Sequence, residues 1–164
     1  MLFKNLNLGM RIALLEKMNT HNKYIFIKRN PFYTAQSLLI ARRKNNNDIE
    51  TWWSVKPPGY KYIQSFNPIK QVVRQVYNIE KQITKDLGEY VNPQDVLTVN
   101  YEDLIQGNLK LEHLRTFIGS AESKQENSNV QLINGNVSRL EKPVLDQIKH
   151  EVEKLDWKGY KSQI

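Results

Sequence analysis

Arg29 follows a short apolar run and precedes a helix start in the segment YIFIKRNPFYTAQSL. Asn30 suits the N-cap and Pro31 the first turn of that helix, so backbone N–H groups should point toward the same place as the Arg29 guanidinium. Ser37 stands two turns into the helix and adds a hydroxyl group. A guanidinium fork beside a helix N-terminus suits a phosphate monoester. The simpler alternatives are a solvated or salt-bridged Arg29 and a Ser37 that packs as a small helix residue.

Two later segments carry further polar side chains of interest. VLTVNYEDL reads as a strand followed by Tyr101 at the start of a short helix, although Tyr101 could equally pack in the core. LINGNVSRLEKP places Gly135, Asn136 and Arg139 in a loop. The simpler interpretation of that loop is an Asn-Gly turn followed by a solvated Arg.

Composition restricts the classes of protein. The 164 residues, 40% of them hydrophobic, can form one core and predict a single domain over residues 1–164. The 24 Lys and Arg against 17 Asp and Glu give a net charge of +7, which favours anionic partners such as nucleotides, sulfated glycans, nucleic acid or acidic lipid. The absence of Cys excludes disulfides and thiolate catalysis. The apolar run at residues 12–15 is too short for a signal sequence or a membrane span, so we expect no membrane span and a cytoplasmic location.

Helices and strands alternate in the elements that must position these residues. Apolar spacing predicts helices at 10–18, 31–44, 68–87, from 101, 108–118 and 143–155. We expect Gly88 to end the third of these helices. Runs of β-branched and aromatic residues predict strands at 23–28 and 95–99, and residues 45–66 read as a long ordered loop rich in aromatic residues. This order predicts an α/β fold with a parallel sheet and flanking helices, in which Arg29 stands at the carboxyl end of a strand where ligands bind.

Together these segments resemble the sulfotransferases that use 3′-phosphoadenosine-5′-phosphosulfate (PAPS). Arg-Asn-Pro followed by Ser eight residues after the Arg is similar to that family's 3′-phosphate segment, and Tyr-Glu-Asp-Leu and the Gly-Asn loop follow in the family's order. The Trp-Trp loop, the amphipathic helix after it and the terminal Gly-Tyr also occur in that order. The resemblance covers most of the chain and implies a P-loop-like sulfotransferase fold.

The resemblance also implies roles for the candidate residues. Arg29 and Ser37 would hold the 3′-phosphate of PAPS or of its product PAP, and Tyr101 would contact the adenine. The loop that closes over the nucleotide would contain three of the candidates: Gly135, Asn136 and Arg139. The reaction would transfer a sulfuryl group to a hydroxyl or amine of a small-molecule or glycan acceptor, without a metal. The aromatic residues of the long loop could stack on a sugar or phenolic acceptor, namely Trp52, Trp53, Tyr60 and Tyr62.

The chain departs from the family at its amino end. Family members carry there a strand and a Lys/Arg-x-Gly-Ser/Thr-type loop that cradles the 5′-phosphosulfate, and this sequence has no such pattern. We therefore interpret it as the carboxyl-terminal portion of a sulfotransferase domain, incomplete at the amino end, whose open sheet edge favours self-association. Lys4 is either an active-site lysine or a flexible terminal charge, and we identify no catalytic base. The three His are expected at the surface and form no metal site: His21, His113 and His150.

Two other functions remain open. A nucleic-acid-binding protein would use the basic run of residues 42–44 for phosphate contacts and the aromatic loop for base stacking. A non-catalytic interaction module related to sulfotransferases would keep the fold and lose the nucleotide.

Overall fold

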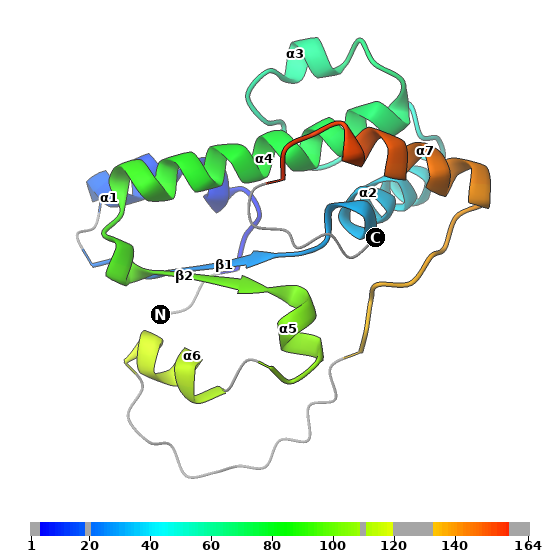
Figure 1. Ribbon diagram of the computed structural model, residues 1–164. Coiled ribbons are helices and arrows are strands. Elements are labelled where there is room, and N and C mark those ends of the chain that lie inside the picture. The colour runs from blue at the N-terminus through cyan, green and yellow to red at the C-terminus, as the bar shows by residue number, and fades with distance from the viewer. Residues whose placement is uncertain (1–3, 19–20, 109–110, 120–132, 158–164) are drawn as a thin grey trace.

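The computed structural model describes residues 4–18, 21–108, 111–119 and 133–157 (Figure 1). Strand β1 (Tyr24–Lys28) pairs in parallel with β2 (Val96–Asn100), residue for residue along their whole length. The helices are α1 (Ile12–Met18), α2 (Pro31–Asn46), α3 (Tyr60–Ile63), α4 (Pro68–Tyr90), α5 (Tyr101–Ile105), α6 (Leu111–Ile118) and α7 (Lys142–Glu153), with 3₁₀ turns at Leu8–Met10 and Pro93–Asp95. The predicted α/β class with parallel strands is thus confirmed.

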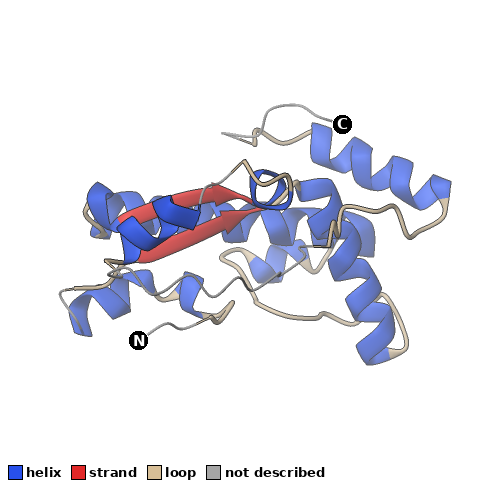
Figure 2. Ribbon diagram, turned by 90° about the horizontal axis from the view of Figure 1, so that it is seen from below, coloured by secondary structure: helices blue, strands red, loops and turns tan. Residues whose placement is uncertain are grey.

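Helices lie on both sides of the two strands. The long helix α4 and helix α1 cover one face of the sheet, and α6 lies across the other (Figures 1 and 2). Because side chains alternate along a strand, Phe26 and Val96 both point toward α4. They pack there against Ile12 of α1 and Leu87 of α4, which are buried. This packing fixes the position of the sheet beneath α4.

A second core joins α2, α4 and α7. Its buried members are Ala35, Leu39, Val72, Val73, Val76, Ile148 and Val152. The α4 members recur at helical spacing, which is the amphipathic pattern predicted for this segment. The core holds α2 against α4. It thereby fixes the direction in which α2 leaves the end of β1.

The start of α2 is formed as the sequence predicts. Asn30 is the N-cap, and its side-chain oxygen accepts a hydrogen bond from the Phe32 backbone N–H at 2.9 Å. Pro31 occupies the first helical position, where its missing N–H leaves no bond unmade. Arg29 is therefore held between the last residue of β1 and a well-defined helix N-terminus.

The predicted end of α4 at Gly88 is wrong. The helix continues to Tyr90, and Val91 then takes an extended conformation with φ −115° and ψ 137°. Gly88 is exposed on the helix and costs it only about 1 kcal/mol relative to Ala, which the packing of Leu87 and Val91 outweighs. Pro93, two residues after the C-cap, suits a chain that cannot continue as helix.

Other boundaries differ by a few residues. The aromatic loop contains the short helix α3, β2 is shifted by one residue, and α6 begins at Leu111. Most of the polar stretch before the last helix and the terminal Gly-Tyr lie outside the described residues. No helix in the described ranges is long and apolar enough to cross a membrane.

Each of the two strands has one edge unpaired within the described residues. Ile27 of β1 is 54% exposed, which leaves apolar surface beside an open strand edge. Self-association remains a prediction that this geometry favours.

Candidate functional site

The guanidinium of Arg29 is bound by the loop of residues 133–140, here called the closing loop. Its Nε donates to Asn136 Oδ1 at 2.8 Å, and its Nη2 donates to the Gly135 carbonyl at 2.6 Å. Its Nη1 lies 3.5 Å from Ser37 Oγ on α2, a long contact for a hydrogen bond. These contacts use three of the five N–H donors of a guanidinium, so one N–H on each of Nη1 and Nη2 can still bind another acceptor. All three of these acceptors are neutral, so within the described part of the chain they leave the positive charge of Arg29 uncompensated by direct contact.

Tyr101 fixes both Arg29 and the closing loop. Its ring centroid lies 5.0 Å from Arg29 Cζ, within the range of a cation–π contact. Its hydroxyl accepts a hydrogen bond from the Gly135 N–H at 3.0 Å and donates to the Ile133 carbonyl at 3.3 Å. Tyr101 therefore covers one side of the guanidinium, and its hydroxyl is engaged with the loop.

Gln36 attaches the closing loop to α2. The Gln36 side chain is 1% exposed. Its Nε2 donates to the Val137 carbonyl at 2.8 Å, and its Oε1 accepts from the Arg139 N–H at 2.7 Å. The backbone of Arg139 is thus held on α2 beside Ser37, while the Arg139 side chain is exposed.

Glu102 forms the remaining link of the site. One of its oxygens, Oε1, accepts from Asn136 Nδ2 at 2.7 Å and from the Asn30 backbone N–H at 3.0 Å. Since Asn136 Oδ1 faces Arg29, the Asn136 amide bridges the cation and the carboxylate. Glu102 stands in the Tyr-Glu-Asp-Leu motif, but sequence reasoning assigned no role to it or to Gln36.

The structure therefore brings five of the six predicted residues together: Arg29, Ser37, Tyr101, Gly135 and Asn136. For the sixth, Arg139, it places the backbone beside the others. Their roles toward a nucleotide stay predictions. Of the other candidates, Lys4 is exposed at the amino end, and all three His are exposed. Among the described residues no cluster of His, Asp and Glu could hold a metal ion.

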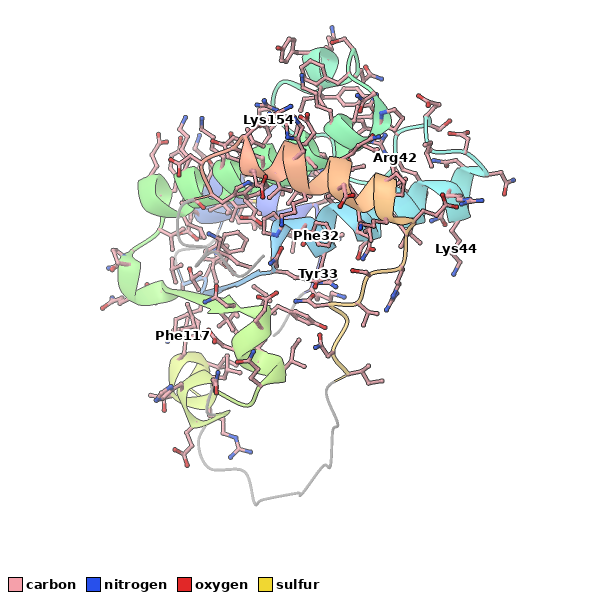
Figure 3. All side chains as sticks on the ribbon, turned by 45° about the vertical axis from the view of Figure 1, so that its right-hand side comes forward. Phe32, Tyr33, Arg42, Lys44, Phe117 and Lys154 are labelled. Atoms are coloured by element: carbon pink, nitrogen blue, oxygen red, sulfur yellow. The ribbon has the colours of Figure 1, made fainter. Side chains whose placement is uncertain are left out.

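The aromatic lobe (residues 48–66) packs on a buried cation. Arg42 of α2 is 0% exposed, and its Cζ lies 4.9 Å from the Trp52 ring centroid. Its Nη1 donates to Gln71 Oε1 at 2.7 Å and to the Ile49 carbonyl at 3.3 Å. Burial lowers the pKa of the Arg42 guanidinium, against the raising effect of nearby acidic groups. Figure 3 shows Arg42 among the helices and Lys44 projecting from the end of α2.

This packing changes the interpretation of the aromatic residues. Trp52 stacks edge-on against Tyr60, with ring centroids 4.6 Å apart, and both belong to the packed part of the lobe. Tyr62 is 70% exposed and Trp53 39% exposed. Arg42 stands eleven residues into α2, about 17 Å along the helix from its start, so the lobe is remote from Arg29.

Position 135 favours glycine because Tyr101 and Arg29 leave no room for a side chain there. A Cβ at this position would lie 2.9 Å from Tyr101 Oη and 3.4 Å from Arg29 Nη2. Gly135→Ala should therefore displace the loop from both residues and weaken the PAP binding that the motif resemblance implies by roughly tenfold, the effect of one or two lost hydrogen bonds. Calorimetric titration with PAP measures this. The matched control is Gly88→Ala, whose Cβ meets no atom within 4 Å. An unchanged affinity in Gly135→Ala would show that the contact does not order the site.

Comparison of the chain with protein-family models, with curated proteins and with solved structures found no match. The functional assignment therefore depends on the geometry around Arg29 and on the motif resemblance.

Proposed function

We propose that this protein binds the 3′-phosphate of PAPS at Arg29 and takes part in sulfuryl transfer to a hydroxyl or amine acceptor. The observation that carries this proposal is the position of the Arg29 guanidinium and the kind of groups that bind it. It stands at a helix N-terminus and is oriented by neutral acceptors, with Ser37 Oγ beside its unused N–H groups. A preformed cation without a direct carboxylate partner among the described residues favours an anion, and a hydroxyl beside it adds a second donor.

Binding of the 3′-phosphate would orient the donor. With one end of PAPS held by Arg29 and Ser37, the sulfuryl group lies at a set distance, where the acceptor oxygen or nitrogen can attack sulfur as the bond to the bridging oxygen breaks. The acceptor proton passes to a base and PAP leaves. The Tyr101 contact with adenine belongs to the same proposal. We assign neither the base nor the cation on the leaving oxygen to a described residue.

The first test is calorimetric titration of the purified protein with PAP and with adenosine 5′-phosphate, which lacks the 3′-phosphate. PAP should bind more tightly. Arg29→Lys should weaken PAP binding by about tenfold or more, because an ammonium group cannot make the two-pronged contact of a guanidinium. Arg43→Lys is the matched control, since Arg43 is exposed one residue beyond the buried Arg42. Equal binding of both nucleotides, or equal loss in both variants, would contradict the proposal.

A non-catalytic module that has lost the nucleotide predicts no binding of PAP, so the PAP titration separates it from the proposed function, and a sulfuryl-transfer assay on phenolic, sugar and amine acceptors then measures turnover of PAPS. Nucleic-acid binding through residues 42–44 loses support from the structure. Arg42 lies buried under Trp52 and cannot contact a phosphate backbone. Oligonucleotide titrations at two salt concentrations test this alternative directly.

A further inference from the structure

Glu102 connects three parts of the site through one oxygen atom. Oε1 accepts from the Asn30 N–H, at the start of α2, and from Asn136 Nδ2, in the closing loop. The other end of the Asn136 amide, Oδ1, accepts from Arg29 Nε at 2.8 Å. Because a carboxylate accepts only, it selects the amino end of Asn136 and leaves the oxygen end for Arg29.

We infer that Glu102 is a positioning residue for the anion site: it orients Arg29 through Asn136 and ties the closing loop to the start of α2. The part of this inference that concerns a nucleotide rests on the proposed function. The part that concerns Arg29 does not, because the contacts that orient the guanidinium are made by residues of this chain.

The bridging amide explains how a carboxylate can serve an anion site. A Glu bound directly to Arg29 would compensate its charge and repel a phosphate. With Asn136 between them, Glu102 contributes direction while the guanidinium keeps neutral acceptors. What the site needs from residue 102 is therefore an acceptor oxygen at the reach of a Glu side chain, and the negative charge is dispensable.

The two conservative variants of Glu102 should therefore differ in the hydrogen bonds that they keep. Glu102→Gln keeps an oxygen at the same reach and should keep both hydrogen bonds. Glu102→Asp keeps the charge but is one methylene shorter, so it should lose the bond to Asn136 and behave like Glu102→Ala. A purely electrostatic role predicts the opposite order, with Asp retaining function and Gln losing it.

The ligand-independent measurement is the Arg29 Nε–H signal in ¹H–¹⁵N NMR spectra of the full chain, assigned from its absence in Arg29→Lys. The unsubstituted protein and Glu102→Gln should show this signal protected from exchange with water. Glu102→Asp and Glu102→Ala should broaden or lose it, and Glu112→Ala, on the exposed side of α6, should not. Protection in Glu102→Asp with loss in Glu102→Gln would overturn the inference, as would protection in all variants.

Titration with PAP gives the second measurement. Glu102→Asp should bind PAP about tenfold more weakly than the unsubstituted protein and Glu102→Gln within about twofold of it. If the unsubstituted protein binds no PAP, the proposed function fails and the NMR comparison still decides the role of Glu102. If PAP binds equally to all variants while the NMR signal changes, the positioning of Arg29 has no consequence for the anion and the inference is overturned.

Discussion

Asn136→Asp should lower PAP affinity by about a hundredfold, since it introduces one carboxylate that places one oxygen against Arg29 and the other against Glu102. The new carboxylate would accept from Arg29 Nε as the Asn136 amide oxygen does, at 2.8 Å, and so would compensate the charge that the anion needs. It would also replace the 2.7 Å hydrogen bond to Glu102 by repulsion between two acceptors. Calorimetric titration with PAP measures the loss.

The matched control for this charge change is Asn67→Asp. Asn67 is the exposed N-cap of α4, where its oxygen accepts from the Lys70 N–H at 2.9 Å, and Asp caps a helix as well as Asn does. The control should bind PAP within about twofold of the unsubstituted protein, because added surface charge remote from a site is largely screened. A similar loss in both variants would point to net charge, and no loss in Asn136→Asp would remove Arg29 from the anion site.

Arg42→Ala should destabilise the protein by about 2–5 kcal/mol, the range for truncating a large buried side chain, to which neutral acceptors left without a donor contribute. The substitution would leave a cavity under Trp52, and it would remove the donor that serves Gln71 Oε1 and the Ile49 carbonyl. The same network holds the backbone of the aromatic lobe. Arg42 Nη2 donates to Gln75 Oε1 at 3.4 Å, and Gln75 Nε2 donates to the Trp53 and Val55 carbonyls at 2.9 Å. The lobe should therefore loosen before the rest of the protein unfolds.

Urea denaturation followed by circular dichroism measures the loss of stability, and limited digestion with trypsin at Lys61 measures the loosening of the lobe. Arg43→Ala is the control, since the exposed neighbour should change the free energy of unfolding by less than about 0.5 kcal/mol. An Arg42→Ala protein as stable as Arg43→Ala would show that Arg42 is stacked on the lobe without supporting it.

The parts of this protein that follow from its sequence are those decided within a few residues. Asn30 and Pro31 define the start of α2 by local capping, and the apolar stripe of α4 follows from the period of the helix. The parallel strands could be expected from the alternation of strand and helix. The motif resemblance also selected Arg29 and the Gly135–Asn136 loop, although their contact joins residues more than 100 positions apart.

The tertiary structure alone decided which polar side chains serve that contact. Gln36 and Glu102 look like ordinary helix residues in the sequence, and their partners in the closing loop stand 101 and 34 positions away. Arg42 reads as the first of three surface cations until packing places it beneath Trp52, and α4 runs past Gly88 because buried neighbours outweigh a weak local preference. The physical reason is the same in each case. Hydrogen bonding and burial depend on groups that are distant in the chain, and a local sequence pattern does not identify those groups.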